Sequence, residues 1–100
     1  MPDPAPLCVV LITYVAPLEA VDAQMKAHVG WLKQALAADL LILAGRRHPR
    51  TGGVLIVRGD AGRVKALAET DPFVTSGVAE IEVIPFGASF AHPALTDLIG

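Results

Sequence analysis

The residue best suited to acid–base chemistry in this sequence is His28, in the segment MKAHVGWL that runs from residue 25 to residue 32. An imidazole changes its charge near neutral pH, so it can both take up and release a proton. Around it, apolar side chains recur at spacings of three, four and seven, which is typical of one face of a helix. They are Leu18, Val21, Met25, Val29, Leu32 and Leu36. His28 falls on this face, about 40° from its centre, so it is either a core residue with a satisfied ring, the more frequent case, or a residue that faces a pocket.

A second candidate is Asp71, which precedes Pro72 at the expected end of the second helix. The negative end of the helix dipole disfavours a carboxylate there by ~0.3–1 kcal/mol, although an Asx turn also places Asp before Pro. If the two helices lie side by side on a sheet, Asp71 and His28 become neighbours. The carboxylate would then fix the tautomer of the ring and favour its protonated form, which makes an acid–base unit. The alternative is a buried structural pair.

Three further features are candidates for binding. Tyr14 ends the first predicted strand, so its hydroxyl could point into the same cavity, or the residue could cap the core as an amphipathic side chain. A short loop is rich in basic residues, which is typical of a solvated hairpin tip but would also suit a substrate anion. Its members are Arg46, Arg47, His48 and Arg50. Trp31, at the margin of the helix stripe, is interpreted as a packing residue or a dimer contact.

No metal or cofactor is expected. The three histidines lack close mutual spacing, and Cys8 is the single cysteine, so neither a metal site nor a disulfide framework is indicated. Glycine-rich phosphate loops, G-x-S-x-G elbows and cofactor fingerprints are missing from the sequence.

Composition bounds the class of protein. The chain has 100 residues, of which 53% are hydrophobic and 18% charged, with a net charge of −2. This predicts one ordered domain with no basic surface for nucleic acid and no polybasic membrane segment. No apolar run approaches the ~18–20 residues that span a membrane, and the start, MPDPAPL, lacks the basic region of a signal peptide. A small-molecule partner and the cytoplasm are therefore expected, with Cys8 as a small buried hydrophobe.

The expected elements follow the order strand, helix, strand, strand, helix, strand. They are strands at 7–14, 40–45, 54–57 and 78–84, one helix from Leu18 or Glu19 to Ala38, and a second from Asp60 to Asp71. We expect a disordered lead at residues 1–6 and a domain at 7–86. From Pro85 the chain is expected to be irregular apart from one short helical turn, with residues 87–100 as a tail that packs on the domain or on a partner subunit.

This order predicts an α+β fold of the ferredoxin-like split βαβ type, with an antiparallel sheet and both helices on one face. The first three strands are apolar at successive positions, so both faces of the sheet must be covered. Because the helices cover only one face, we expect a homodimer in which two sheets pack against each other. The alternative is that the C-terminal tail folds over the bare face.

Several residues in combination match a known family. They are His28 within KAHVGWL, Gly45, Gly52-Gly53, the run from Thr70 to Phe73, Gly77 and the closing IEVIPF. From Leu7 to Phe86 the sequence resembles the YCII-related family. The resemblance implies a dimeric ferredoxin-like α+β barrel with an active site at His28 and Asp71. It also implies kinship with muconolactone isomerases and heme-free monooxygenases, and with a relative thought to eliminate HCl from a chlorinated hydroquinone-type ring.

The chain departs from the family pattern at three positions. Met25 stands where members often carry Arg, Lys26 where they often carry Pro, and Gly53 where a serine is common. Arg46 or Arg47 would then supply the anion contact that the missing arginine provides elsewhere. The predicted substrate contacts are Tyr14, Arg46, Gly53 and Phe73, although Phe73 could instead anchor its turn.

Together these features predict a small, cofactor-independent enzyme. His28 would act as general acid and base, oriented by Asp71, in an elimination or isomerisation of a small hydroxylated aromatic or anionic substrate. The alternative is a non-catalytic small-molecule-binding or accessory protein of the same fold.

Overall fold

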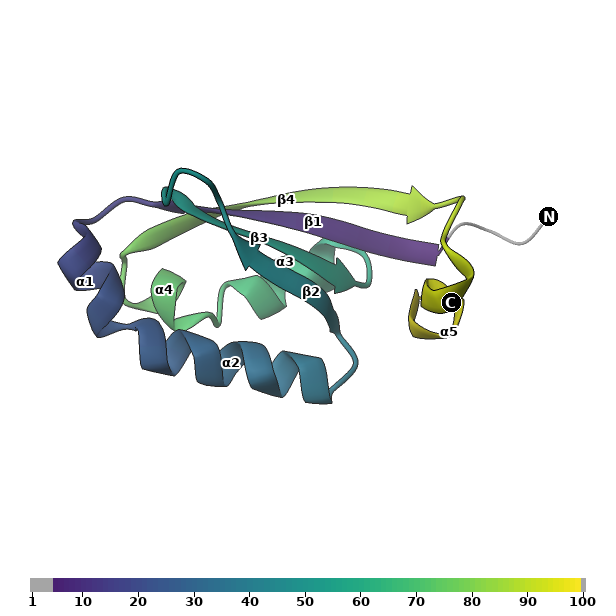
Figure 1. Cartoon of the computed structure of the whole chain (residues 1–100), viewed down its shortest axis with the longest axis horizontal. Coiled ribbons are helices and arrows are strands. Elements are labelled where there is room, and N and C mark those ends of the chain that lie inside the picture. Colours follow the sequence, from purple (N-terminus) through teal and green to yellow (C-terminus); the bar gives the residue numbers. More distant parts are fainter. Residues whose placement is uncertain (1–4, 100) are drawn as a thin grey trace.

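In the computed structural model, which describes residues 5–99, a four-stranded antiparallel sheet has the strand order β2-β3-β1-β4 (Figure 1). The strands are β1 (Ala5–Tyr14), β2 (Leu41–Arg46), β3 (Gly52–Arg58) and β4 (Ala79–Ala88). The helices are α1 (Leu18–Ala23), α2 (Met25–Ala37), α3 (Ala61–Ala68), α4 (Pro72–Thr75), the 3-10 helix η1 (Pro93–Leu95) and α5 (Thr96–Ile99). This arrangement confirms the α+β class and is consistent with the ferredoxin-like fold expected from the order of the elements.

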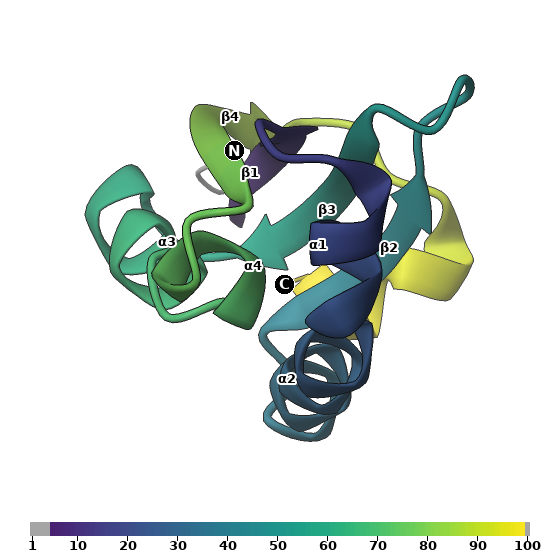
Figure 2. The same cartoon turned by 90° about the vertical axis from the view of Figure 1, so that its left-hand side faces the viewer.

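The core lies between the sheet and the helices that cover one of its faces. In β1 the alternate side chains of Cys8, Val10 and Ile12 are buried on this inner face. Figure 2, which looks along the sheet, shows that α2, α3 and α4 all lie on the same side of the sheet. Val21 of α1, Val64 of α3 and other fully buried side chains complete the core. α2 and α4 meet under the sheet, and this contact brings distant parts of the sequence together.

The expected long helix from Leu18 to Ala38 is two helices. Gln24 separates α1 from α2, and its backbone N–H donates to the carbonyl of Val21, three residues back, at 3.0 Å. This tighter turn ends α1 and changes the direction of the chain (Figure 1). The sequence pattern does not reveal this break, because there is no Gly or Pro at Gln24 and the helical spacing of apolar residues continues from α1 into α2.

The expected second helix also ends early. α3 stops at Ala68, and Asp71 does not close it but caps the following helix α4, where its side chain accepts a hydrogen bond from the backbone N–H of Phe73 at 3.0 Å. Pro72 occupies the first helical position, which its fixed φ favours. Asp71 is thus at the favourable end of a helix, and the expectation of an unfavourable dipole at this residue is wrong.

β1 and β4 are both longer than expected. β1 begins at Ala5 rather than Leu7, and β4 continues to Ala88 instead of becoming irregular at Pro85. β4 lies at an edge of the sheet, where a proline can sit because only one side of the strand needs hydrogen-bond donors. The first four residues of the expected lead lie outside the described residues.

Cys8 is free and fully buried, as its apolar surroundings in the sequence indicate. Its thiol donates to the carbonyl of Gly59 at 3.5 Å. Burial, with a contribution from the nearby Asp60 carboxylate, raises the pKa of the Cys8 thiol. The residue therefore behaves as a small apolar side chain rather than as a nucleophile.

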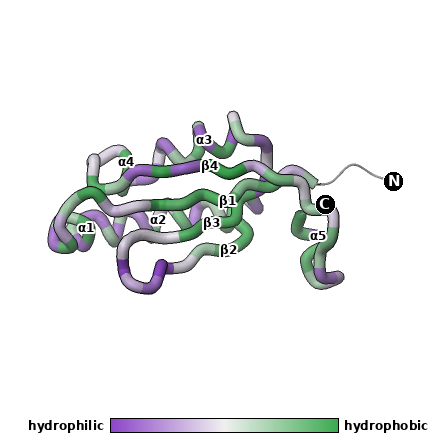
Figure 3. The backbone as a smooth tube through the Cα atoms, turned by 90° about the horizontal axis from the view of Figure 1, so that it is seen from above, coloured by the Kyte–Doolittle hydropathy of each residue, from purple (hydrophilic) through white to green (hydrophobic). Residues whose placement is uncertain are grey.

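The second face of the sheet, which we call the outer face, has no helix on it. The strand register places eight apolar side chains there. They are Leu7, Val9, Leu11, Leu43, Val54, Ile56, Ile84 and Phe86. Figure 3, which looks onto this face, shows hydrophobic residues along the middle of the sheet. The outer face is therefore apolar over its middle, while Glu80 and Glu82 of β4 make one end of it polar.

The described part of the C-terminal tail does not cover the outer face. η1 and α5 lie at the end of the sheet beside the start of β1 (Figure 1). Leu43, Ile84 and Phe86 remain 54%, 41% and 43% exposed, and Phe90, just after β4, is 98% exposed. The alternative to the dimer, in which the tail folds over this face, is therefore wrong for residues up to 99.

None of the helices among the described residues is long and apolar enough to span a bilayer.

Gly52 is a position where the fold requires glycine. A Cβ built there would lie 1.7 Å from the backbone oxygen of Ile12, whereas one built at Gly30, on the exposed side of α2, meets nothing within 4 Å. We expect Gly52→Ala to lower the free energy of unfolding by about 2–3 kcal/mol or more, because β1 and β3 must move apart. Gly30→Ala should raise it by about 0.5–1 kcal/mol. Urea unfolding of both variants checks this, and equal stabilities would contradict the close strand packing.

Candidate active site

His28 and Asp71 meet between α2 and α4. The Nδ1 atom of His28 lies 2.7 Å from Oδ1 of Asp71, and the two residues are 7% and 1% exposed. They are 43 positions apart in the sequence, and the packing of the two helical segments under the sheet brings them together. The expectation that these side chains become neighbours is correct, and their chemical role stays a prediction.

The Asp71 carboxylate uses one oxygen for two hydrogen bonds. Oδ1 accepts from the backbone N–H of Phe73 as the helix cap and also faces the His28 ring. The other oxygen, Oδ2, is buried without a hydrogen-bond partner among residues 5–99. His28 is therefore the one side chain in this part of the protein that is bonded to the carboxylate.

This geometry assigns the two nitrogens of His28 different tasks. An ionised carboxylate can only accept hydrogen bonds, so Nδ1 carries the proton that points at Asp71. The neutral ring then presents the lone pair of Nε2 on its other side. His28 lines a cavity, so Nε2 is the atom that is available to a bound molecule.

Aromatic rings hold the imidazole in its plane. Phe73 stacks on His28 with ring centroids 3.9 Å apart and planes 8° apart, and Trp31 lies near-parallel at 6.2 Å and 19°. Tyr14 meets the edge of Phe73 at 5.7 Å. Stacked and edge-to-face rings restrict each other's tilt, so Phe73 has a supporting role as well as its place in the cavity wall.

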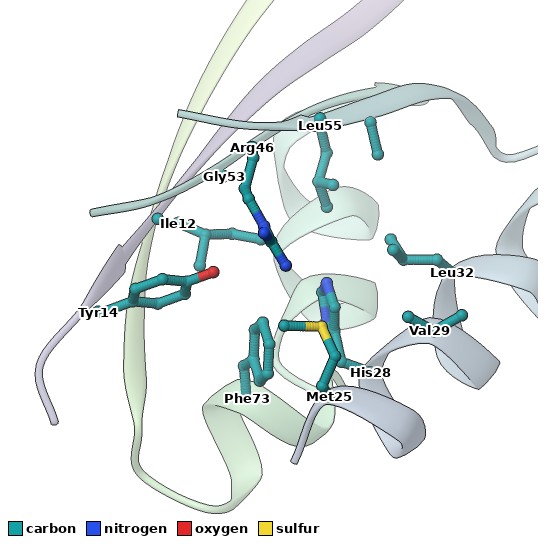
Figure 4. A pocket seen from close by; sticks show the side chains of 13 residues that line it. Ile12, Tyr14, Met25, His28, Val29, Leu32, Arg46, Gly53, Leu55 and Phe73 are labelled. Atoms are coloured by element: carbon teal, nitrogen blue, oxygen red, sulfur yellow. The ribbon is translucent and has the colours of Figure 1, made fainter. Parts of the chain in front are cut away.

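The cavity beside His28 has a volume of about 180 Å³ and mostly apolar walls (Figure 4). Its lining residues are Ile12, Tyr14, Met25, His28, Val29, Leu32, Ala44, Gly45, Arg46, Gly52, Gly53, Leu55 and Phe73. An apolar cavity of roughly 150 Å³ accommodates benzene in a well-studied engineered protein. The cavity therefore fits one six-membered ring with a few substituents.

Small residues on the inner face of the sheet leave this space open. Arg46 of β2 pairs with Gly53 of β3, and Ala44 pairs with Leu55. Gly53 carries no side chain, and a Cβ there would already lie 3.1 Å from the carbonyl of Gly45. The predicted site residue Gly53 therefore lines the cavity with its backbone, and the absence of a side chain leaves space for a bound molecule.

Two polar side chains face His28 across the cavity. Figure 4 shows the guanidinium of Arg46 and the hydroxyl of Tyr14 pointing into the same space as the His28 ring. Among the described residues, Arg46 forms no ion pair. Arg46 is therefore free to meet an anionic group in the cavity.

Two other arginines of the hairpin have partners within the protein. Arg47 donates to the hydroxyl of Thr13 at 3.4 Å, and Arg50 forms an ion pair with Asp22 of α1. The hydrogen bond from Arg50 holds the pKa of the Asp22 carboxyl below its usual value. Of the two arginines considered for the anion contact, only Arg46 lines the cavity.

Several residues that line the cavity were not predicted from the sequence as part of the site. Val29, Leu32 and Leu55 form walls of the cavity, and Met25 lines it as well (Figure 4). In the sequence these residues have the ordinary spacing of a helix or strand core, so no local signal separates a cavity wall from the core. Among residues 5–99, no three His, Cys, Asp or Glu side chains are grouped so that they could hold a metal ion.

Comparisons with known proteins agree with this architecture. A family model described as YCII-related domain matches residues 7–87. Among solved structures, the chain is similar to a 5-chloro-2-hydroxyhydroquinone dehydrochlorinase from Burkholderia phenoliruptrix in complex with 2,5-dihydroxybenzoquinone. The two chains are 19% identical with a TM-score of 0.66, over 88% of this chain and 96% of the other, which shows a shared fold. No curated protein matches the chain.

The contribution of the His28–Asp71 bond can be separated from that of the helix cap. Asp60 also caps a helix, α3, but it is exposed: its Oδ1 accepts from Arg63 N–H at 2.9 Å, and its Oδ2 lies 3.9 Å from the exposed Arg63 Nε. We expect Asp60→Ala to cost about 1 kcal/mol and Asp71→Ala about 2–4 kcal/mol, since it also leaves His28 unpaired. Urea unfolding measures both, and equal losses would mean that the buried pair adds nothing to stability.

Proposed function

Because this chain belongs to the YCII-related family, we propose that it is a small, cofactor-independent enzyme in which His28 transfers a proton at Nε2 and Asp71 holds the ring. The observation that carries this proposal is the buried 2.7 Å contact between His28 and Asp71 at the wall of a ring-sized cavity. A positioned imidazole with a fixed tautomer is suited to general acid–base catalysis.

The proposed reaction is an elimination or an isomerisation. The substrate ring reacts as a keto tautomer, in which one ring carbon is saturated. His28 Nε2 removes a proton from a carbon or hydroxyl group of this tautomer, and the electron pair of the broken bond forms a new double bond conjugated with the ring. In an elimination, the leaving group departs with the electrons of its own bond. In an isomerisation, the imidazolium returns the proton to another carbon of the substrate. Asp71 stays ionised and supports the imidazolium while the proton is held there.

The proposed substrate is one ring that carries an ionised oxygen. The size of the cavity limits it to a single ring, and the unpaired Arg46 guanidinium offers a charge-assisted hydrogen bond to a phenolate or carboxylate. The hydroxyl of Tyr14 is placed for a second hydrogen bond, Phe73 for contact with the ring face, and Gly53 for close approach to the backbone. A neighbour of the same fold was solved with 2,5-dihydroxybenzoquinone, which is a ring of this size.

We also propose that two copies pack through their outer faces. Seven of the eight apolar side chains on the outer face stay partly exposed, which is a larger apolar patch than a monomer surface usually shows. A second copy of the chain would cover them without a further protein. Phe90, 98% exposed just beyond the end of β4, is available for the same partner subunit. On this proposal residues 87–99 pack on the domain or the partner, and 7–86 form the domain itself.

The catalytic proposal predicts a large and specific loss in His28→Gln. Turnover of 5-chloro-2-hydroxyhydroquinone, followed as chloride release, should fall by about 10²–10⁴-fold with the fold intact by circular dichroism. Arg47→Gln serves as the control because Arg47 contacts Thr13 outside the cavity. Unchanged turnover in His28→Gln would contradict the acid–base role. Binding of 2,5-dihydroxybenzoquinone without any turnover would favour the non-catalytic binding protein instead.

The anion contact predicts a charge-selective effect of Arg46→Gln. Binding of an ionised hydroxylated ring such as 2,5-dihydroxybenzoquinone should weaken by about tenfold or more, because a charge-assisted hydrogen bond is lost. Binding of uncharged phenol should change little. Isothermal titration with wild type, Arg46→Gln and Arg47→Gln measures both ligands, and an equal loss for both would contradict the proposed role of Arg46.

The dimer proposal predicts that wild type sediments as a dimer at micromolar concentration. Leu43→Glu, which places a charge on the outer face, should sediment as a monomer. Leu36→Glu is the matched control, since Leu36 is similarly exposed but lies on α2, away from the outer face. A monomeric wild type would contradict the proposal.

A further inference from the structure

A second hydrogen bond joins α2 to the segment that carries Asp71. The indole Nε1–H of Trp31 donates to Oγ1 of Thr70, the residue directly before Asp71, at 2.9 Å. His28 and Trp31 are three residues apart on α2 and so lie on the same side of the helix. Two neighbouring side chains of one helix thus hold two consecutive residues of the other segment.

Among the described residues, these two contacts are the only side-chain hydrogen bonds between α2 and residues 69–75. A single bond would let the segment pivot about the His28–Asp71 contact. A second bond, one residue away, fixes the orientation of the segment as well as its distance. The position of the Asp71 carboxylate therefore depends on both.

The hydroxyl of Thr70 is set up to accept from Trp31. Its own proton is donated to the carbonyl of Leu67 at 2.6 Å, within the end of α3. The oxygen then has lone pairs left for the indole. The chain of bonds from Trp31 through Thr70 to Leu67 therefore connects α2 with the backbone that leads into Asp71.

Trp31 is not a wall of the cavity at His28; it lies in a groove between α2 and α3 with Thr70 and Leu67. Any effect that it has on chemistry must be exerted through His28 and Asp71. Its ring is also near-parallel to His28, with planes 19° apart, which limits the tilt of the imidazole.

From this arrangement we infer that Trp31 is a positioning residue, which acts through Thr70 to keep Asp71 in register with Nδ1 of His28. The inference rests on the proposed function for its chemical meaning, since a proton-transferring imidazole needs one tautomer and one orientation. The hydrogen-bonded geometry itself is open to measurement without any substrate.

The test uses ¹⁵N and ¹H NMR of the His28 ring in the full chain, at a pH where the ring is neutral. Wild type should show a slowly exchanging Nδ1 proton and the Nδ1–H tautomer. Trp31→Phe removes the donor of the bond and keeps an aromatic ring, and Thr70→Val removes the acceptor together with its own bond to Leu67. In both variants, exchange of this proton should rise by roughly two- to tenfold, the range for one lost hydrogen bond. The tautomer should shift toward Nε2–H.

Two controls make the result specific. Thr70→Ser keeps the hydroxyl and should restore the wild-type spectrum. Thr75→Val removes a hydroxyl of α4 that bonds only to the Pro72 carbonyl, at 3.5 Å, and should leave His28 unchanged. The double variant Trp31→Phe/Thr70→Val should be no worse than Thr70→Val alone, because the bond that Trp31→Phe removes is already absent there.

A lower melting temperature in Trp31→Phe and Thr70→Val with the His28 resonances of wild type would overturn the inference and leave a purely structural bond. A wild-type ring in the Nε2–H tautomer would overturn it as well. Failure of the proposed enzyme activity would look different, because the chloride-release assay would be silent while the tautomer shifts persist.

Discussion

The structure depends on one requirement, which is that a carboxylate buried to 1% exposure must be paired. An ionised group out of water is costly unless hydrogen bonds and an opposite partner compensate for lost hydration. Asp71 meets this requirement at Oδ1 alone, with the Phe73 backbone N–H and the His28 ring, while Oδ2 has no partner among residues 5–99. The helices that carry these groups can therefore pack correctly in only one register, and that register also orients the imidazole.

Four consecutive residues show how closely folding and site geometry are joined. Thr70 accepts from Trp31, Asp71 caps α4 and holds His28, Pro72 starts the helix, and Phe73 stacks on the His28 ring. A change in any of them alters both the stability of the helical layer and the setting of the ring. The segment was recognisable in the sequence as a turn, but its separate contacts depend on α2, which lies more than thirty residues earlier.

The two faces of the sheet have different tasks. On the inner face, large side chains fill the core at one end, and glycines at the other end leave the cavity between β2, β3 and α2. On the outer face, apolar residues alternate with those of the core because successive side chains of a strand point to opposite sides. The same strands can thus line a binding cavity and present a surface for a second copy.

The sequence by itself determined the order of the elements, the α+β class, the family and the two residues that meet at the site. The order and the class follow from local patterns, which are strand-length apolar runs and helical spacing. The family and the pairing of His28 with Asp71 were indicated by the resemblance of several motifs to the YCII-related family. Tertiary structure alone decided that Asp71 caps α4 rather than closes α3, that the first helix breaks at Gln24, and that Arg46 rather than Arg47 lines the cavity. It also decided that Trp31 binds Thr70. The physical reason is that each of these depends on the distance between residues far apart in the chain, and that distance is set only when the helices pack on the sheet.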